Sequence, residues 1–463
     1  MADLCKQSGD EFMRERKTQS KWLLAGLTLA LLSLASVPAH AQLGVIPGIS
    51  GPSFNLSTGT GYITTPDGDS LLIWGYGSGV PQYPGPTLIV NQGDTVTINL
   101  TNNLPQPTSI IFPGQGDDPS TPADESVAAS GGTCPGTAGC LLTAEATENG
   151  GTASYTFTAT HAGTYLYHSG TNAELQIEMG LFGAIIVRPN GFDQTSNRIA
   201  YDAPGTDYVA EYLLLFSEMD PAVHEKADLG LYSQIDFTQY DPRLWFVNGR
   251  NAPDTLADQN IPWMPHQPYN ALPIIHPGER LLTRIIGASH NLHPWHMHGN
   301  NLDVIAQDGR LLTTTPEDQG ATAAGPDLRR SANTVATAPL KTYDGIWEWT
   351  GSELGWDIYG HIDTDPMEPF EYAPDHGKSL PVILPEFQDL AFGGFWSGSP
   401  FLGAYGDLPP GEGGLNIGGG LYHIWHSHSE KELINNDVFP GGMLTFCVVV
   451  PHDVLAFPWS PVP

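Results

Sequence analysis

Residues 84–103 have the sequence PGPTLIVNQGDTVTINLTNN. Two short runs within this stretch, 87–90 and 95–100, are rich in β-branched and aliphatic residues, and Asn, Gln, Gly and Asp separate them. Apolar and β-branched runs between turn-forming residues are typical of β-strands. The stretch therefore predicts two strands joined by a tight turn, and similar runs recur along the rest of the chain.

The predicted strands fall into two sets. Residues 154–158, 163–168 and 183–188 complete the first set, and a polar, turn-rich stretch follows it. The second set consists of runs at 211–216, 244–247, 280–286, 302–306, 345–349, 421–426 and 443–450. A long stretch rich in Gly, Pro and aromatic residues interrupts the second set over 351–420. Long loops of this kind often cover a site or an interface.

Length and composition agree with this organisation. Only 15% of the 463 residues are charged, and 53 Gly and 40 Pro supply many turns. We therefore predict an all-β protein of two β-sandwich domains, over 42–190 and 206–463, with a linker over 191–205 and an insertion over 351–420 in the second domain. The formal net charge of −32 excludes nucleic acid as a partner, because phosphate binding requires clustered cations.

The first 41 residues have the features of a signal peptide. Basic residues between Arg14 and Lys21 precede an apolar run over 22–37, and Ala39-His40-Ala41 has the small-x-small pattern that a signal peptidase reads. A membrane anchor would need roughly 20 apolar residues, and this run is shorter. We expect cleavage near Ala41, a secreted or periplasmic location, and no membrane span in the mature chain.

The cysteines agree with an oxidising compartment. Cys134 and Cys140 bracket a short turn in a Gly-, Ser- and Thr-rich segment, and we expect them to close a small disulfide loop. Cys447 lies in the apolar run Leu444–Val450, where we expect a buried core thiol.

The spacing of the histidines is the strongest indication of a functional site in the sequence. They are concentrated in the strings HNLHPWHMHG, residues 290–299, and HIWHSH, residues 423–428. In a strand, residues i and i+2 lie on the same face, so His296/His298 and His426/His428 each present two neighbouring imidazoles. One such pair is commonly a surface feature, but two pairs that face each other form a four-nitrogen cage suited to copper or zinc.

Several stretches together resemble the multicopper oxidase family. They are residues 84–103, 163–168, 179–184, 293–299 and 426–428, which keep the family's order and spacing over nearly the whole mature chain. The resemblance implies cupredoxin-like Greek-key sandwiches and a copper cofactor. Because the second half resembles one domain rather than two, it also implies a two-domain protein similar to two-domain laccases and copper nitrite reductases. These relatives are homotrimers with metal sites between subunits, so we expect a homotrimer.

The sequence departs from the family pattern at the copper ligands. The first motif, where the family has two histidines, reads TSIIFPG over 108–114, and the second keeps only His168. In the last motif Ser427 stands where the family has a cysteine. A blue copper centre requires a thiolate, which a serine hydroxyl cannot replace. His293 matches the family's first blue-copper histidine, but residues 429–432 supply no second one, so we expect no blue centre.

The resemblance leaves a defined set of candidate ligands. For metal binding these are His168, His293, His296, His298, His426 and His428, and all except His293 belong to the residual oxygen-reducing cluster. We expect this cluster to hold one or two copper ions, with another divalent metal as the alternative. Glu430 and Glu432 are candidate partners for a ligand imidazole or else solvated loop charges. His423 has the opposite strand phase, and we expect scattered histidines such as His224, His361 and His376 to lie outside the site.

Two functions follow from these residues. The first is a secreted copper-binding protein of multicopper oxidase type whose oxidoreductase chemistry, on a small molecule or oxygen, is non-standard. Its catalytic residues are unknown from the sequence. The second is a non-catalytic cupredoxin scaffold or a copper-storage or assembly protein. Fold alone does not decide between them.

Overall fold

The computed structural model describes residues 44–115, 128–130, 143–315, 325–379, 402 and 421–452. The expected signal peptide, the expected loop between Cys134 and Cys140 and most of the predicted insertion beyond residue 379 lie outside the described residues. Among the described residues, no helix combines the length and the apolar character needed to cross a membrane.

The first half of the chain forms two sheets. Its strands are β1 (Ile49–Ser50), β2 (Ser53–Thr64), β3 (Ser70–Gly77), β4 (Leu88–Asn91), β5 (Thr95–Asn102), β6 (Ala128–Ser130), β7 (Gly151–Thr158), β8 (Gly163–His168) and β9 (Phe182–Arg188). The strand orders are β1-β4-β9-β8 and β3-β2-β5-β7-β6. The runs predicted at 87–90 and 95–100 are thus confirmed as β4 and β5. A short helix, α2 (Ala173–Glu178), connects β8 to β9.

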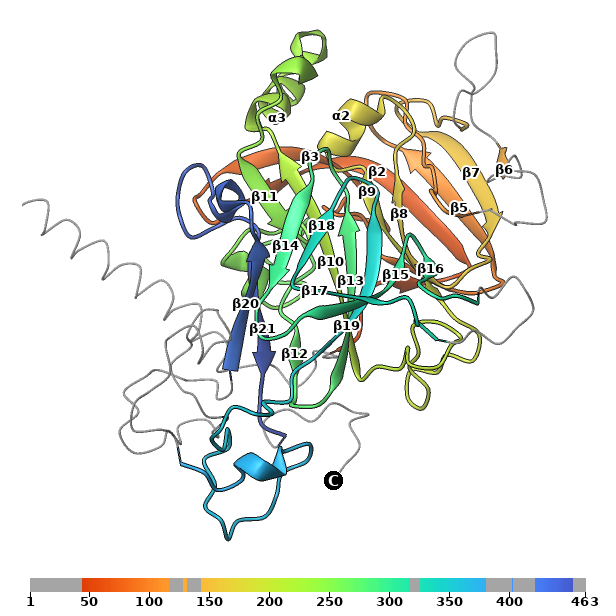
Figure 1. Ribbon diagram of the computed structural model, residues 1–463. Helices are drawn as coiled ribbons and strands as arrows, with labels where there is room; N and C mark the ends of the chain where they lie inside the picture. The colour runs from red at the N-terminus through yellow and green to blue at the C-terminus, as the bar shows by residue number, and fades with distance from the viewer. Residues whose placement is uncertain are drawn as a thin grey trace, which may run out of the picture.

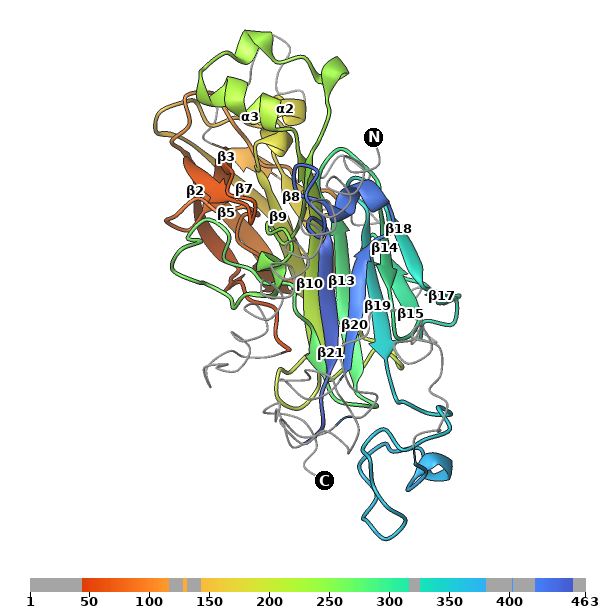
Figure 2. The ribbon, with the colours of Figure 1, turned by 90° about the vertical axis from the view of Figure 1, so that its left-hand side faces the viewer.

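The second half forms two further sheets (Figures 1 and 2). Its strands are β10 (Ala210–Met219), β11 (Leu244–Val247), β12 (Ile274–Ile275), β13 (Arg280–Gly287), β14 (His293–Met297), β15 (Leu302–Gln307), β16 (Arg310–Leu311), β17 (Arg330–Ala332), β18 (Thr334–Thr337), β19 (Thr342–Glu348), β20 (Leu421–Ser427) and β21 (Leu444–Val449). The strand orders are β11-β10-β13-β19-β15-β16, with β17 on β15, and β12-β21-β20-β14-β18. The all-β prediction is confirmed.

Helical structure in this half is limited to short connections. The described segments are α3 (Pro221–Asp228) and the 3₁₀ turns η2 (Tyr232–Gln234), η3 (Phe237–Gln239), η4 (Asp254–Leu256), η6 (Ala373–Asp375) and η7 (Glu430–Leu433). α3 begins with Asp220 as its N-cap, whose carboxylate accepts a hydrogen bond from the backbone N–H of Ala222, and Pro221 follows at the first helical position.

The hydrophobic core of the second half lies between its two sheets. The buried residues show which face of each strand points inward and which points outward. Trp295 and Met297 of β14 and Trp425 of β20 are buried there with Leu214 and Trp347. Burial of large apolar side chains stabilises a fold by roughly 1.5–3 kcal/mol each. Because side chains alternate along a strand, residues between these buried positions point to the opposite, outer face of the five-stranded sheet.

The first half packs on the other sheet of the second half. Thr164 of β8 accepts a hydrogen bond from Arg284 of β13 (3.0 Å), and Arg284 pairs with Glu211 and Asp344. Both views place β10 and β13 between β8 and β14 (Figures 1 and 2). The first half therefore lies on one side of the second sandwich, and the outer face of β14 lies on the other.

The stretch predicted as a linker, 191–205, is folded against the second half. Asp193 and Asn197 form an isolated β-bridge, and Tyr201 is buried. The Tyr201 hydroxyl donates a hydrogen bond to Asp344 of β19. These contacts hold the connection against the sheet that faces the first half.

Candidate metal centre

Four histidines meet on the outer face of β14 and β20. The two strands are antiparallel, and His296 lies directly opposite His426. The ring centre of His296 is 4.7 Å from that of His298, 5.4 Å from that of His426 and 4.9 Å from that of His428. The structure therefore brings both predicted pairs together, side by side on neighbouring strands of one sheet rather than facing each other from two sheets.

Three of these histidines form a compact donor set. His296, His298 and His426 each offer a ring nitrogen, and these nitrogens all lie within 4.8 Å of one another. The Nε2 atoms of His298 and His426 are 3.1 Å apart. With metal–nitrogen bonds of about 2.0 Å, that separation corresponds to an angle of about 100° at a shared cation. The spacing fits two ligands of one copper or zinc ion.

The surrounding residues orient these rings. His426 donates a hydrogen bond from Nδ1 to the Ser427 carbonyl oxygen (2.7 Å), which leaves the lone pair of Nε2 for a ligand. Nδ1 of His296 is hydrogen-bonded to the Thr334 hydroxyl of β18 (2.7 Å). A partner on the second ring nitrogen is the usual support of a metal-binding histidine. No inference from the sequence identified Thr334, because its strand is separated from β14 by a long stretch of chain.

Electrostatics favour neutral imidazoles in this group. Burial lowers the pKa of His296, and the neighbouring His426 and His428 lower it further. Burial also lowers the pKa of His426. His428 is more exposed, and its Nδ1 lies 3.4 Å from a Glu430 carboxylate oxygen. Since metal binding requires the neutral ring, the donor chemistry of the cluster fits the copper that the family resemblance implies.

Within one chain His168 lies apart from the cluster, and its meeting with the other histidines across a subunit boundary, as expected from the sequence, stays a prediction. It ends β8, on the far side of the second sandwich from β14 (Figures 1 and 2). Its ring is only 4% exposed, and Nδ1 donates to the Ser169 carbonyl oxygen. Nε2 is buried without a hydrogen-bond partner among the described residues. The ring is covered within its own chain and separated from the other ligands.

His293 is also not available as a ligand, because carboxylates occupy both of its ring nitrogens. Nε2 lies 2.9 Å from a Glu218 oxygen and Nδ1 lies 3.0 Å from a Glu432 oxygen. Burial opposes protonation of the ring, but the two carboxylates outweigh it and raise the pKa of His293 to about 9. The protonated ring has no lone pair for a metal, so the prediction of His293 as a ligand is wrong for this arrangement.

Where the sequence resembles the family's blue-copper motif, His293 instead forms a charged, hydrogen-bonded group with Glu218 and Glu432. Ser427 is fully buried, and its hydroxyl accepts a hydrogen bond from the Ser429 backbone N–H (3.1 Å). Glu432 contacts His293 and so does not support the histidine cluster. The sequence singled out Glu432 but missed Glu218, which is 75 residues from His293 in the chain.

Two further residues lie as the sequence indicated. His423 is buried against Trp347 and Trp349 on the opposite strand face, and burial lowers its pKa to about 3. Cys447 is a free, buried thiol in the core of the second half. Neither residue belongs to the metal-binding group.

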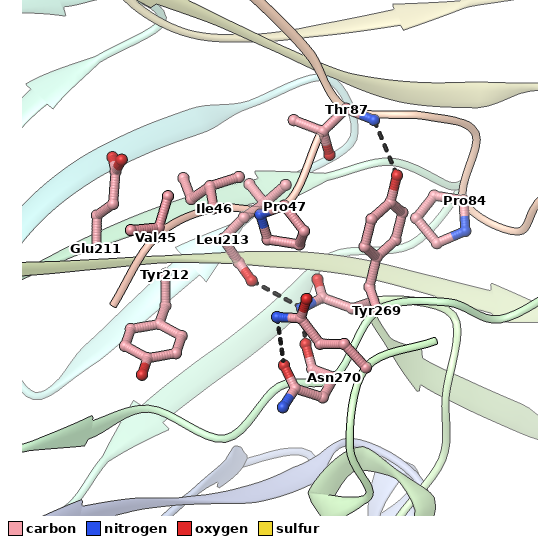
Figure 3. Close-up of a pocket in the computed structure, with 12 residues that line it drawn as sticks. Val45, Ile46, Pro47, Pro84, Thr87, Glu211, Tyr212, Leu213, Tyr269 and Asn270 are labelled. Atoms are coloured by element: carbon pink, nitrogen blue, oxygen red, sulfur yellow. Dashed lines mark hydrogen bonds between the residues drawn. The ribbon is translucent and has the colours of Figure 1, made fainter. Parts of the chain in front are cut away.

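The described cavities lie away from the histidine cluster. The one in Figure 3 has a volume of about 20 Å³, and Pro47, Tyr212, Tyr269 and Asn270 line it. That volume holds about one water molecule, which is too small for an organic substrate. A broader hollow of about 370 Å³ adjoins Tyr240, Trp245 and Glu432, above the charged group around His293. Among the described residues, His296, His298 and His426 are half-buried and His428 is exposed.

Comparison with known proteins agrees with the resemblance seen in the sequence. Residues 64–191 match the family model described as multicopper oxidase. Multicopper oxidase MCE of Talaromyces pinophilus is 40% identical over 111 residues, which are 23% of this chain and 15% of that protein. Copper resistance protein A of Escherichia coli is 26% identical over 334 residues, which cover 65% of this chain and 50% of that protein. The chain thus spans half or less of these relatives.

Solved structures show the same fold. The blue copper oxidase from Nitrosomonas europaea superimposes with a TM-score of 0.52 at 18% identity, covering 86% of this chain and 85% of that one. The multicopper oxidase mgLAC gives a TM-score of 0.51 at 18% identity, covering 88% of this chain and 89% of that one. The resemblance seen in the sequence is thereby confirmed: the chain is similar to multicopper oxidases, has the cupredoxin fold of these structures, and matches the multicopper oxidase family model over residues 64–191.

Proposed function

We propose that this protein is a secreted or periplasmic copper-binding protein that holds copper at His296, His298 and His426. The observation that carries the proposal is the 3.1 Å separation of the His298 and His426 Nε2 atoms on one strand face. His428 lies beside this group and is 55% exposed, so it is the candidate fourth ligand. One or two copper ions are consistent with these four rings.

Residues around the ligands would orient the imidazole rings, and burial would keep the rings neutral for metal binding. Thr334 and the Ser427 carbonyl fix the ring planes of His296 and His426, and the lowered pKa values keep these rings neutral. The outer face leaves room beside the ligands for a small molecule or oxygen. Copper bound there would supply one-electron redox chemistry and an open coordination position.

The same structure argues against a standard laccase cycle. That cycle needs a thiolate that connects a blue copper to the histidine cluster, and Ser427 cannot take this role. Glu218 and Glu432 hold His293 as a cation where a neutral ligand would be required. Any oxidoreductase activity therefore uses electrons delivered directly to the histidine cluster.

A non-catalytic copper-storage or assembly protein is the second candidate. The exposure of His428 favours it, because copper bound there is accessible for exchange with another carrier. Oxygen uptake in the presence of a small reductant separates the two candidates. An enzyme shows uptake that depends on bound copper and is lost in His298→Ala, whereas a storage protein retains copper without uptake above that of the metal-free chain.

Equilibrium dialysis of chelator-stripped protein against Cu²⁺ tests the proposal itself. We expect at least one copper ion per chain to remain after dialysis. Because neutral imidazoles are required and burial lowers the pKa of His296 and His426, copper should be released only as the pH falls below the ordinary imidazole value of about 6.5 and protons begin to compete for the rings. Failure to retain any copper at neutral pH would overturn the proposal.

A further inference from the structure

We infer that the segment over 357–376 contains a second metal site, a closed structural site for a Zn²⁺-class cation. Its ligands are Asp357, His361, Glu371 and His376, each of which offers one atom within 4.8 Å of the others. This site is independent of the proposed copper centre, because none of its residues lies in β14 or β20. It goes beyond the proposed function and does not rest on it.

The distances among the four side chains match a tetrahedral cation site. Nδ1 of His361 lies 3.4 Å from an Asp357 oxygen and 3.7 Å from a Glu371 oxygen. Nδ1 of His376 lies 3.7 Å from the same Asp357 oxygen and 2.7 Å from the same Glu371 oxygen. A tetrahedron with metal–ligand bonds of about 2.1 Å has an edge of about 3.4 Å. Three of these four edges already lie near the required length, and the fourth, between His376 and Glu371, is a direct hydrogen bond that would lengthen when a cation replaces its proton.

An unused ring nitrogen marks the centre of this group. Nδ1 of His361 is buried and makes no hydrogen bond with any described residue, although two carboxylates lie nearby. A buried polar atom without a partner is costly. A cation bonded to Nδ1 would satisfy it and would occupy the space between the carboxylates.

The charges also call for a cation. The Asp357 side chain is fully buried and that of Glu371 is 3% exposed, and in the described part of the chain their charged partners are the two imidazoles rather than a Lys or Arg. Nε2 of His376 donates to the Asp365 carbonyl oxygen (3.1 Å), so a cation at Nδ1 would replace the proton that now lies between Nδ1 and Glu371. Buried carboxylates are stable only when paired or bound to a metal. The mixture of two imidazoles and two carboxylates is a donor set typical of Zn²⁺.

The backbone holds the carboxylates in place before a cation binds. Asp357 accepts hydrogen bonds from the backbone N–H groups of Tyr359 and Gly377 (2.8 Å each). Glu371 accepts one from the backbone N–H of Glu368 (2.8 Å). The Tyr359 ring stacks on His361 with a ring-centre distance of 5.4 Å. The ligands are therefore preorganised by contacts outside the group, as metal sites require.

The place of the segment in the fold explains what a cation would do there. Residues 351–379 project from the end of the second sandwich and contain the 3₁₀ turn η6 but no β-strand (Figures 1 and 2). Ile358, next to Asp357, belongs to the core of the second half. A cation would tie the turn at 371–376 to this anchored residue and close the loop, as metals do in segments with little core of their own.

Zinc binding by the full chain tests the inference. The His296→Ala/His298→Ala double variant serves as the background, because it removes the imidazole cluster as a competing site. After chelator treatment, dialysis against Zn²⁺ alone should leave one zinc per chain. His361→Gln and His376→Gln should each weaken this binding by at least about 100-fold, whereas Glu353→Gln, an exposed position in the same loop and outside the ligand set, should not.

Two additional measurements keep the test decisive. Co²⁺ in the same background should give the intense visible bands of a tetrahedral site, and these should vanish in His361→Gln. If the background does not fold, as judged by circular dichroism, the otherwise unaltered chain should lose one zinc equivalent on His361→Gln while its copper binding stays unchanged. Equal zinc content in His361→Gln, His376→Gln and Glu353→Gln, or no zinc in any of them, would overturn the inference.

Discussion

At the scale of single residues, Ser427 determines which copper chemistry is possible. Its hydroxyl is not ionised near neutral pH, and it lies in the core with a hydrogen bond from the Ser429 N–H. The neighbouring His426 and His428 point to the other face of the strand, where they meet His296. Strand alternation alone predicted this division, and the structure confirms it.

Copper-loaded protein should therefore lack the intense absorption near ~600 nm that Cu²⁺–thiolate bonding produces in blue sites. Ser427→Cys alone should not create the band, because Glu218 and Glu432 keep His293 protonated. Visible spectroscopy of both proteins provides the measurement. A blue band in unaltered protein that survives Cys447→Ser would show that a different cysteine binds copper and that the blue-copper motif has been misplaced.

His293 gives the stability of the protein a distinct pH dependence. Its pKa of about 9 in the folded chain exceeds the ordinary value of about 6.5. A raised pKa contributes stability that is fully present below pH 6.5 and is lost as the pH rises through 9. We expect the free energy of unfolding of metal-free protein to fall by roughly 3 kcal/mol over this window.

Urea unfolding at several pH values measures this effect. The matched variant His293→Gln keeps a polar side chain without a titrating ring, so its unfolding free energy should change much less between pH 6.5 and 9. The same decline in both proteins would mean that another group is responsible.

At the scale of elements, the strand pair β14 and β20 was the most predictable part of the site. The i, i+2 spacing placed His296 with His298 and His426 with His428, because strand periodicity is local information. Long-range contacts were not predictable in this way. The sequence did not indicate that β8 packs on the sheet opposite β14, which separates His168 from the cluster, nor that Glu218 reaches His293.

The predicted insertion illustrates the same limit. His361 and His376 occur in an irregular segment without periodic spacing, so the sequence suggested scattered histidines. Their approach to Asp357 and Glu371 depends on turns whose geometry no local pattern specifies. The strands themselves were predicted well, because alternating apolar residues between Gly, Pro and Asn carry a strong local signal.

Thr334 of β18 is hydrogen-bonded to His296 of β14, so a neighbouring strand of the sheet supports a metal ligand. Thr334→Val removes the hydrogen bond to Nδ1 of His296 and keeps the side-chain shape, so copper affinity should fall by about 10–100-fold. Competition with a chromophoric chelator measures the affinity. Thr337→Val on the same strand, whose hydroxyl bonds the Val335 carbonyl, is the control, and equal loss in both variants would refute a specific role for Thr334.

At the scale of the whole molecule, the first half packs on only one of the two sheets of the second sandwich among the described residues. The first half covers the sheet that contains β13, with Arg284 buried at the junction. The sheet that contains β14 and β20 presents its histidines on the other side, where His428 is 55% exposed. A second copy of the chain can therefore approach the histidine face without disturbing the contact between the halves.

The homotrimer expected from the family resemblance stays a prediction, and the histidine face is where we place its interface. In a cyclic trimer the contact is heterologous, so the first half of one chain meets the second half of the next. Light scattering at micromolar concentration should give the mass of three chains. A monomer that still binds copper would contradict an intersubunit site and would leave the four histidines as a complete site within one chain.

The central claim is that His296, His298 and His426 hold copper on the outer face of one sheet. Metal analysis of copper-dialysed protein tests it most directly when His298→Ala and His426→Ala are compared with His168→Ala. His168 occupies the corresponding strand end in the first half, but it lies apart from the cluster. The account predicts that the first two variants lose most of their copper while His168→Ala keeps the amount found in unaltered protein, with all variants folded by circular dichroism. Equal copper in all three variants, or its loss in His168→Ala alone, would contradict the account.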